Sequence, residues 1–286
     1  VLDAPNLRPY AALLGDTVVG ATLVAEEGGF DTDVAEGFAA GTARPRAHAL
    51  ADVLAAQLGH PEAATLKIRR SVRIAVLPEV RRRGIATALV EHVHRAEPAD
   101  LWGTLFGATA GLIAFRRSVG YEVAGVSASR GARTGEPSVL MLRPQSERAR
   151  ALLSELRVEL ARELPARLKL LAADDGLTVE PELAAALGEG LPAATPYTPQ
   201  RAREVARAYG DGPRTFESVA TAIRTFVEHR SLTDLPAPER AVVQARVVDG
   251  RSWSEAAHLG GHDNRRLAMR AQRRAIRQML ADDDGA

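Results

Sequence analysis

Short runs in which hydrophobic and polar residues alternate open the chain, a pattern typical of β-strands. Pro9–Leu14 and Thr17–Ala25 are two such runs, and the Gly15-Asp16 pair between them predicts a hairpin turn. Helical patterns separate the β-prone runs that follow, which predicts an α/β sandwich of one mixed sheet flanked by helices. The further runs are Ile68–Leu77, Leu101–Phe106, Tyr121–Val126 and Ser138–Leu142.

Helical periodicity marks three segments among these strands. In Glu79–Arg95, apolar residues recur four apart on one face of the predicted helix. Ala110–Val119 follows Thr109, a favourable N-cap residue. Residues 27–66 are rich in Gly and Ala and contain a helical pattern at Ala47–Leu58. A stretch this long between two strands indicates an insertion, and insertions of this size are often functional.

Beyond Pro144 the pattern is almost wholly helical, and prolines and glycines separate the helices. We therefore expect two domains: an α/β domain over residues 1–143 and an all-α C-terminal domain over residues 144–286. The expected helices are Glu147–Leu164, Leu168–Leu171, Pro181–Leu187, Pro199–Tyr209, Phe216–His229, Pro238–Asp249, Ser252–Leu259 and Arg265–Leu280.

Composition narrows the classes of function. The formal net charge of +1 gives no overall field toward nucleic acid or membrane, so a basic partner surface must be local. The absence of cysteine excludes disulfides, thiolate metal sites and a cysteine nucleophile. No apolar run reaches the length of a membrane span and no signal peptide opens the chain, so we expect a cytoplasmic location. Because the chain starts at Val1 rather than Met, we expect a piece of a longer polypeptide.

The candidate chemistry lies where a strand, a turn and a helix meet at residues 72–89. Unpaired amides and the positive end of the dipole at a helix N-terminus favour a pyrophosphate. Gly84 would let the backbone approach phosphates closely, and Arg81, Arg82 and Arg83 would add positive charge. The plainer interpretation is an ordinary strand–loop–helix with a basic cap.

The spacing Arg81-x-x-Gly84-x-Ala86 resembles the signature of the GNAT acetyltransferase superfamily, Arg/Gln-x-x-Gly-x-Gly/Ala. Further motifs, in the right order, resemble the tRNA(Met) cytidine acetyltransferase family, and this resemblance covers essentially the whole chain. These motifs are Arg44-Pro45-Arg46-x-His48, Val72-Arg73-Ile74-Ala75-Val76-x-Pro, Gly103-Thr104-Leu105-Phe106-Gly107-Ala108-Thr109, Phe115-x-x-x-x-Gly120-Tyr121 and Thr134-Gly135-Glu136.

The resemblance implies a GNAT-type fold that transfers acetyl from acetyl-CoA to the N4 amino group of a cytidine in RNA. In bacteria this is the wobble cytidine of elongator tRNA(Met), so the implied partner is tRNA. The resemblance also implies that the strand residues Ile74, Ala75 and Val76 pair with the pantetheine arm. The positions implied for the rest of the cofactor, mainly its pyrophosphate, are Arg81, Arg82, Arg83, Gly84, Ile85, Ala86, Thr87 and Arg117.

The chain departs from the family pattern at several positions. It has Gly111 and Arg116 where the family commonly has Glu and Trp, and Ala47 and Ala49 flank His48 where Gly and Pro are expected. Family members also carry an ATPase-helicase module with a phosphate loop, and no such motif occurs in this sequence. ATP is therefore expected as a cofactor only if a separate upstream module exists.

A cytosine amino group is a poor nucleophile, so its attack on a thioester needs a base with a pKa near neutrality. His48 is the candidate base and Glu136 the alternative; a surface histidine and a solvated loop carboxylate are the plainer interpretations. Tyr121 could protonate the thiolate leaving group, or it could be a core residue. An N–H near Val76 could stabilise the oxyanion. No metal-ligand spacing occurs, so no metal is expected.

The last predicted helix carries a row of arginines opposite an apolar face, well suited to RNA phosphates. A solvated arginine face explains the same pattern equally well. Leu235–Gly260 also resembles the helix-turn-helix of sigma-factor region four, whose last helix would read DNA. Two other functions therefore stay open: a GNAT enzyme acting on a small amine or protein, and a nucleic-acid-binding module with a degenerate acetyltransferase site. The arginines in the row are Arg266, Arg270, Arg273 and Arg277.

Overall fold

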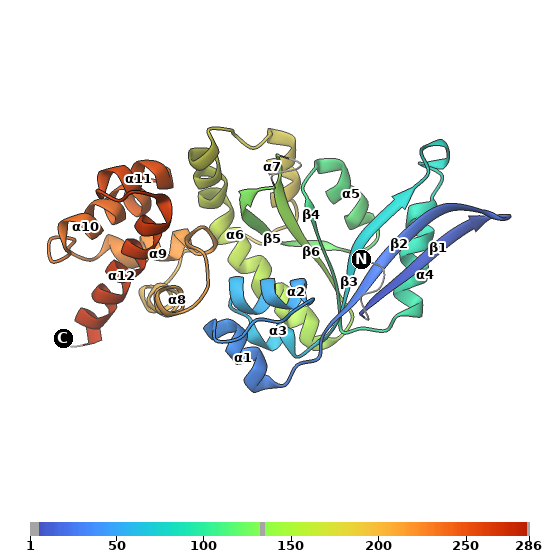
Figure 1. The fold of residues 1–286 in the computed structure, drawn as a ribbon, viewed down its shortest axis with the longest axis horizontal. Helices are drawn as coiled ribbons and strands as arrows, with labels where there is room; N and C mark the ends of the chain where they lie inside the picture. The colour runs from blue at the N-terminus through green and yellow to red at the C-terminus, as the bar shows by residue number, and fades with distance from the viewer. Residues whose placement is uncertain (1–5, 132–134, 285–286) are drawn as a thin grey trace. The chain divides into compact units, whose positions relative to one another are not determined.

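The computed structural model describes residues 6–131 and 135–284 of the chain (Figure 1). The N-terminal segment on which the expectation of a longer polypeptide rests, and Thr134 of the Thr134-Gly135-Glu136 motif, lie outside the described residues. The chain divides into two compact units. The first comprises residues 1–127 and 131–157, and the second comprises residues 128–130 and 158–286. The expected domain boundary at residue 144 stays a prediction.

A six-stranded mixed sheet forms the centre of the α/β region, with the strand order β1-β2-β3-β4-β6-β5 (Figure 1). β3 and β4 run parallel, whereas β1 with β2, β2 with β3 and β4 with β6 run antiparallel. This confirms the mixed sheet expected from the sequence. The strands are β1 (Leu7–Leu14), β2 (Thr17–Gly28), β3 (Lys67–Val76), β4 (Leu101–Gly107), β5 (Glu122–Arg130) and β6 (Pro137–Pro144).

The insertion between β2 and β3 covers one face of the sheet. It contains α1 (Thr32–Ala40), α2 (Ala49–Asp52), a π-helical turn η1 (Val53–Gln57) and α3 (Pro61–Ala64). Its apolar side chains share a core with β4, β6 and the first turns of α6 (Glu147–Asp175). Gly103 in β4 is required by this packing, because a Cβ there would come within 2.2 Å of the Leu50 side chain.

Two helices cover the opposite face. α4 (Ile85–Ala96) packs on β1, β2 and β3, and α5 (Ala110–Ser118) follows β4. The Thr109 hydroxyl accepts a hydrogen bond from the amide of Leu112, which confirms the expected N-cap of α5. The prediction that helix α4 starts at Glu79 was wrong, because the backbone takes left-handed conformations at Arg82 and Gly84 before the helix begins.

The C-terminal region is helical, as expected from the sequence. Two expected helices, Glu147–Leu164 and Leu168–Leu171, are one continuous helix, α6, with Pro165 inside it. Proline removes one backbone donor from a helix, and here that loss does not end it. The other elements are α7 (Pro181–Gly188), α8 (Pro199–Asp211), the 3₁₀ turn η3 (Phe216–Ser218), α9 (Ala220–Glu228), α10 (Ala237–Val243), the π-helical turn η4 (Gln244–Val248), α11 (Trp253–Leu259) and α12 (Arg265–Asp284).

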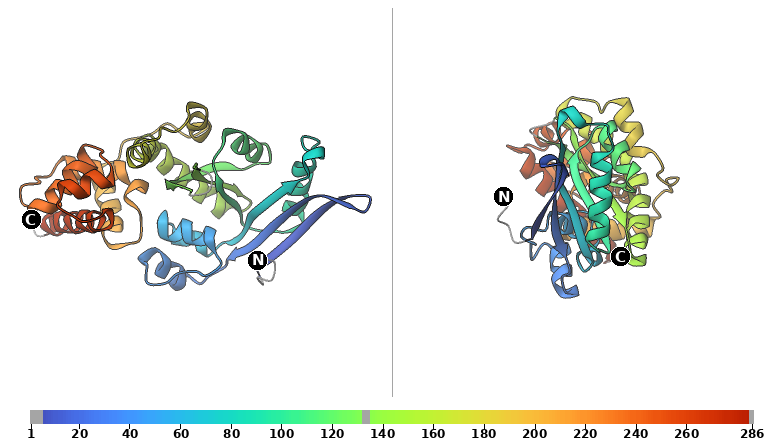
Figure 2. Two further views of the ribbon diagram at one scale, coloured as in Figure 1. Left: turned by 45° about the horizontal axis from the view of Figure 1, so that its top comes forward. Right: turned by 90° about the vertical axis from the view of Figure 1, so that its right-hand side faces the viewer.

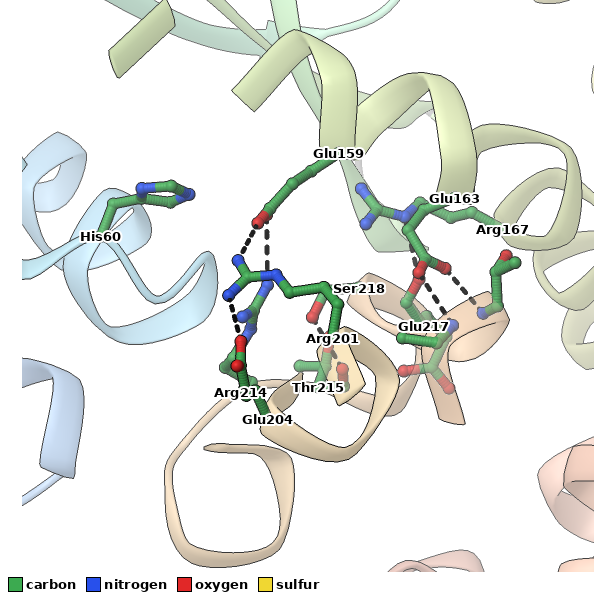
Figure 3. A network of polar contacts seen from close by, with 12 residues as sticks. His60, Glu159, Glu163, Arg167, Arg201, Glu204, Arg214, Thr215, Glu217 and Ser218 are labelled. Atoms are coloured by element: carbon green, nitrogen blue, oxygen red, sulfur yellow. Dashed lines mark hydrogen bonds and ion pairs between the residues drawn. The ribbon is translucent and has the colours of Figure 1, made fainter. Parts of the chain in front are cut away.

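Side chains from the second half of α6 hold the neighbouring helices of the second unit (Figure 3). The Glu163 carboxylate accepts a hydrogen bond at 2.8 Å from the amide of Thr221, in the first turn of α9. Glu159 lies 3.3 Å from the guanidinium of Arg201 in α8. Such contacts join α6 to α8 and to the start of α9, segments that are far apart in the sequence.

A buried ion cluster ties four segments of the second unit together. The Arg246 side chain is fully buried, and its guanidinium lies 2.7 Å from the carboxylate of Asp174 and 2.8 Å from that of Glu217. Asp174 also accepts a hydrogen bond from the backbone amide of Trp253 at 2.8 Å. The cluster thus joins the end of α6, the 3₁₀ turn η3, the π turn η4 and the start of α11.

We predict that Arg246→Met lowers the free energy of unfolding by about 3–5 kcal/mol, because it leaves two carboxylates without their buried cation. Urea denaturation followed by circular dichroism measures the change. Arg251→Met is the matched control, because Arg251 is half exposed and pairs with Asp249 only at 3.7 Å. Its cost should stay below about 1 kcal/mol. Equal losses in the two variants would contradict a stabilising role of the cluster.

Candidate active site

The turn between β3 and α4 has an unusual backbone. Pro78–Val80 form one turn of 3₁₀ helix, Arg82 has a φ of 59° and Gly84 has a φ of 79°. A left-handed conformation costs a non-glycine residue roughly 1–2 kcal/mol, so Arg82 is held there by its surroundings. One tether is visible: the Arg81 side chain donates to the carbonyl of Val76 at 3.1 Å. Strain of this kind is concentrated at functional sites.

The N-terminus of α4 presents free backbone donors. The first helical hydrogen bond runs from the amide of Ala88 to the carbonyl of Gly84, and no side chain caps the helix. The amides of Ile85, Ala86 and Thr87 therefore have no acceptor within the helix. The guanidiniums of residues 81–83 are exposed beside them. Free amides, a helix dipole and exposed guanidiniums together could hold an anion such as a diphosphate.

The edge of β3 that faces β4 is open next to this turn. Among the described residues the two strands pair only at Ile68, Arg69 and Arg70 of β3, and beyond these residues they diverge (Figure 2). The amide of Leu77 donates to β2, and amide directions alternate along a strand. The amides of Ile74 and Val76 therefore face the open edge, where an extended ligand could pair with them as an additional strand does.

Buried polar groups surround the point where the strands diverge. The Thr104 hydroxyl donates to the carbonyl of Ser71 at 3.0 Å, and the Arg116 guanidinium donates to the Ser71 hydroxyl at 3.0 Å. Burial lowers the pKa of Arg116, and the nearby Tyr121 opposes this shift. One terminal nitrogen of Arg116 has no hydrogen-bond partner among the described residues. The end of the open edge is therefore polar and electropositive.

The C-terminal end of α4 is anchored by Glu97, which is almost fully buried. Its carboxylate lies 2.9 Å from the guanidinium of Arg8 and 3.2 Å from that of Arg69, and it accepts a hydrogen bond from Tyr10. Burial would raise the pKa of Glu97, but the hydrogen bonds from Tyr10, Arg8 and Arg69 together lower it below its ordinary value of 4.5. These contacts hold α4, and with it the anion site, against β1 and β3.

No family model matches the chain. Its sequence is 34% identical over 290 residues to a tRNA(Met) cytidine acetyltransferase TmcA of Nitrosococcus halophilus, covering 98% of this chain and 38% of that protein. The proteins of the same name from Haloferax volcanii and Thermococcus sp. are 32% and 30% identical, each over 90% of this chain. The chain is a homologue of the tRNA(Met) cytidine acetyltransferases. It spans 38%, 34% and 33% of the length of these three relatives.

Solved structures with partial similarity are also acetyltransferases. Nourseothricin acetyltransferase matches with a TM-score of 0.32 and 18% identity over 49% of this chain and 66% of its own. The ribosomal-protein-S18-alanine N-acetyltransferase of Escherichia coli matches with a TM-score of 0.33 and 14% identity, over 51% of this chain and 75% of its own. Scores this low do not by themselves establish a common fold.

Most of the residues that the sequence assigns to the cofactor come together in the structure. Ile74, Ala75 and Val76 form the end of β3, and residues 81–87 form the turn and the first helical residues after it. Arg117 lies on a different element, in the last turn of α5. Its assignment to the cofactor stays a prediction.

As the candidate base, His48 should lie close to these residues. In the structure it does not. It is the N-cap residue of α2, and its Nδ1 accepts a hydrogen bond at 3.1 Å from the amide of Gly28. Gly28 pairs with Lys67, at the other end of β3 from Val76, which puts the two positions about 30 Å apart along the strand. Ala47, directly before the histidine, has a left-handed φ of 63°, a conformation that glycine adopts more readily than alanine.

Tyr121 lies at the divergence of the strands, and Glu136 lies at the end toward which they open. Glu136 directly precedes β6, whose Ser138 pairs with Gly107 at the carboxyl end of β4. Tyr121 is buried, and its hydroxyl lies 2.9 Å from Nε2 of His94 on α4. The sequence analysis missed His94 as a partner of Tyr121, because no local pattern connects residues on different elements.

The arginine row on α12 is divided in the structure. Arg266 and Arg270 are exposed. Arg273 is half-buried, and its guanidinium donates to the carbonyls of Tyr209, Gly212 and Arg214. Arg277 donates to the carbonyl of Gly210 at 3.3 Å. Two of the four expected RNA contacts therefore hold the end of α8, and the RNA-binding assignment as a whole stays a prediction.

Two further observations bear on metals and membranes. His60, Glu62 and Glu155 bring three potential ligand atoms within 4.8 Å of one another. Nδ1 of His60 lies 2.9 Å from the Glu62 carboxylate, and both carboxylates are exposed, so a local hydrogen bond accounts for the approach of His60 and Glu62. Within the described residues, every helix is too short or too polar to cross a bilayer.

We predict that Glu97→Gln lowers the free energy of unfolding at pH 7 by about 2 kcal/mol, because it removes charge-assisted hydrogen bonds. The folded-state pKa of Glu97 lies below 4.5, so this stabilisation is present above pH 4.5 and is lost as the pH falls through the folded-state pKa. Urea denaturation between pH 3 and 7 should show a smaller loss on acidification in the variant. Glu91→Gln, an exposed carboxylate on the same helix, is the control and should follow the wild type.

Proposed function

We propose that this chain is the acetyl-transferring part of an RNA cytidine acetyltransferase. It would transfer acetyl from acetyl-CoA to N4 of a cytidine, with the wobble cytidine of elongator tRNA(Met) as the substrate. The homology to proteins named tRNA(Met) cytidine acetyltransferase over 98% of the chain carries this proposal. A cytoplasmic location, expected from the sequence, is consistent with tRNA as the substrate.

The described residues fit acetyl-CoA as the acetyl donor. The free amides of Ile85, Ala86 and Thr87 suit its diphosphate, with the exposed guanidiniums of residues 81–83 beside them. The open edge of β3 offers the amides of Ile74 and Val76 to the amide groups of the pantetheine arm. A helix N-terminus and a free strand edge occur separately in many folds; their succession in one strand, turn and helix supports a long ligand with a diphosphate at one end.

The cofactor supplies an activated acetyl thioester, and the protein's task is to orient it and to compensate charge. An N–H donor at the divergence end of the open edge would stabilise the oxyanion that forms on attack by N4. Val76, near which the sequence predicts this donor, lies at the other end of the edge, next to the turn that would hold the diphosphate. Electropositive groups at the divergence point, Arg116 among them, favour negative charge on the departing sulfur. Glu136 is the remaining candidate base, because it precedes the strand next to the carboxyl end of β4.

Incubation of the chain with labelled acetyl-CoA and tRNA, followed by mass spectrometry of the nucleosides, tests the activity. N4-acetylcytidine is the expected product. Label found only on small amines or on protein would instead support a GNAT enzyme with another substrate. Absence of acetyl-CoA binding would support a nucleic-acid-binding module with a degenerate site.

We predict that Gly84→Glu abolishes acetyl-CoA binding without unfolding the protein. No atom lies within 4 Å of a Cβ built at Gly84, so a side chain fits but places its charge where the diphosphate would bind. Gly250→Glu is the matched control, since Gly250 has a φ of 70° and equally open surroundings in the second unit. Calorimetry should show binding by the control and none by Gly84→Glu; equal affinities would remove the site assignment.

We predict that the double variant Arg266→Glu and Arg270→Glu weakens tRNA binding and flattens its dependence on salt. Two lost phosphate contacts should make the slope of log K against log salt shallower by roughly 1.4–1.8. Fluorescence anisotropy between 50 and 300 mM KCl measures the slope. Arg150→Glu, an exposed arginine of α6 that pairs with Glu147, serves as the control. An unchanged slope in the double variant would exclude this face of α12.

A further inference from the structure

His94 and Tyr121 form a polar pair inside the first unit, on the face of the sheet covered by α4 and α5. Nε2 of His94 and the hydroxyl of Tyr121 are 2.9 Å apart, and the histidine ring lies 4.7 Å from the ring of Trp102. Tyr121 is 1% exposed. A buried hydroxyl needs one hydrogen-bond partner, and a backbone carbonyl would satisfy that need. Here the partner is a titratable side chain on another element.

The pair separates two cavities, and His94 lines both of them. The inner cavity, of about 10 Å³, lies beside the divergence point and is lined by Thr22, Ser71, Trp102 and Tyr121, among others. A volume of this size holds one water molecule. The outer cleft, of about 490 Å³, is lined by polar residues that include Gln145. His94 is thus placed between a small internal cavity, lined by valines as well as by these polar groups, and a cleft that is open to solvent.

The groups around the pair keep the histidine neutral. Burial, then the charges of Arg143 on β6 and Arg116 on α5, lower the pKa of His94 to about 3. Glu91 and Arg95 of α4 also line the outer cleft, one negative and one positive. Burial raises the pKa of Tyr121, against the opposing charges of the same two arginines. At neutral pH the pair therefore holds one phenolic proton and one imidazole proton.

An internal water has further partners at the inner cavity. The indole N–H of Trp102 is buried and has no hydrogen-bond acceptor among the described residues. The Ser71 hydroxyl, at the divergence of β3 and β4, lines the same cavity. One water could accept from the indole and reach the Tyr121 hydroxyl. This would connect the pair to the end of the open edge, where the thioester of the proposed function belongs.

We propose that Tyr121 and His94 form a proton relay between this end of the open edge and the outer cleft, a role that rests on the proposed function. N4 of cytidine bonds to the thioester carbon, the carbon–sulfur bond breaks, and the sulfur takes the phenolic proton of Tyr121, directly or through the internal water. The phenolate oxygen takes the proton from Nε2 of His94, and Nδ1 takes one from water in the outer cleft. The proton lost by N4 leaves to solvent, so one proton enters and one leaves per turnover. Exchange with water then restores the Nε2–H tautomer.

Steady-state kinetics of RNA acetylation by four variants test the relay. Tyr121→Phe and His94→Ala should each lower kcat roughly 100-fold, the scale of one general acid, with the KM for acetyl-CoA unchanged. Because the two residues act in series, the double variant should be no slower than either single variant. Added imidazole should restore kcat in His94→Ala but not in Tyr121→Phe. His92→Ala, an exposed histidine of the same helix, should behave as the wild type.

Multiplicative losses in the double variant, or unchanged kcat in either single variant, would overturn the relay. If the variants lose acetyl-CoA affinity and circular dichroism signal, and imidazole does not restore kcat in His94→Ala, the pair is only a structural contact.

Nitrogen NMR of the histidine rings tests the relay independently of RNA acetylation. The relay requires the neutral Nε2–H tautomer of His94 at pH 7, with that hydrogen on the Tyr121 oxygen and a loss of the hydrogen bond in Tyr121→Phe. The opposite tautomer, in which Tyr121 donates to His94, refutes the relay even if the chain acetylates RNA. If the chain shows the Nε2–H tautomer of His94 but does not acetylate RNA, the hydrogen-bonded pair of His94 and Tyr121 is supported and the proposed function is removed.

Discussion

The divergence of β3 from β4 is the constraint on which the first unit depends. Three residue pairs join the two parallel strands, and beyond them the described ladder pairs of β3 are with β2. Because this strand edge is unpaired, the fold lacks the hydrogen bonds that a continuous sheet would make there. The same groups are then available to a ligand, and the end of β3 feeds directly into the turn whose amides are also free. The open strand edge and the uncapped helix N-terminus, which follow one another along the chain, are thus the two halves of the candidate site.

The elements around this opening hold it in place. Glu97 fixes the far end of α4 to β1 and β3 through Arg8, Arg69 and Tyr10. On the other face, the insertion between β2 and β3 packs its apolar side chains on β4 and β6, with Leu50 filling the space that Gly103 leaves. The strands can diverge without collapsing together because each is supported by a different layer.

Buried charge is used differently in the two units. In the second unit Arg246 is neutralised by Asp174 and Glu217, so the cluster is a closed structural contact. In the first unit Arg116 is also buried, but a serine hydroxyl is its described partner and one of its nitrogens has none. A buried cation without a carboxylate partner is costly, and the described groups beside this one are the rings of Phe115 and Tyr121, at 5.7 and 5.5 Å from the guanidinium.

The sequence by itself determined what depends on neighbours along the chain. The strand, the turn with Gly84 and the helix after it lie within one short segment, so their residue types were sufficient to predict this order of elements. The start of α4 was misplaced, because Arg82 takes a left-handed conformation, and the anion site in the turn stays a prediction. Only the tertiary structure decided which distant residues meet. It separated His48 from Val76, because β2 pairs with β3 in antiparallel register and puts Gly28 at the opposite end. It turned Arg273 toward the carbonyls at the end of α8, and it brought His94 to Tyr121 across the face of the sheet. Periodicity states which face of a helix is polar, but the partner of that face is set by long-range packing, which local sequence does not encode.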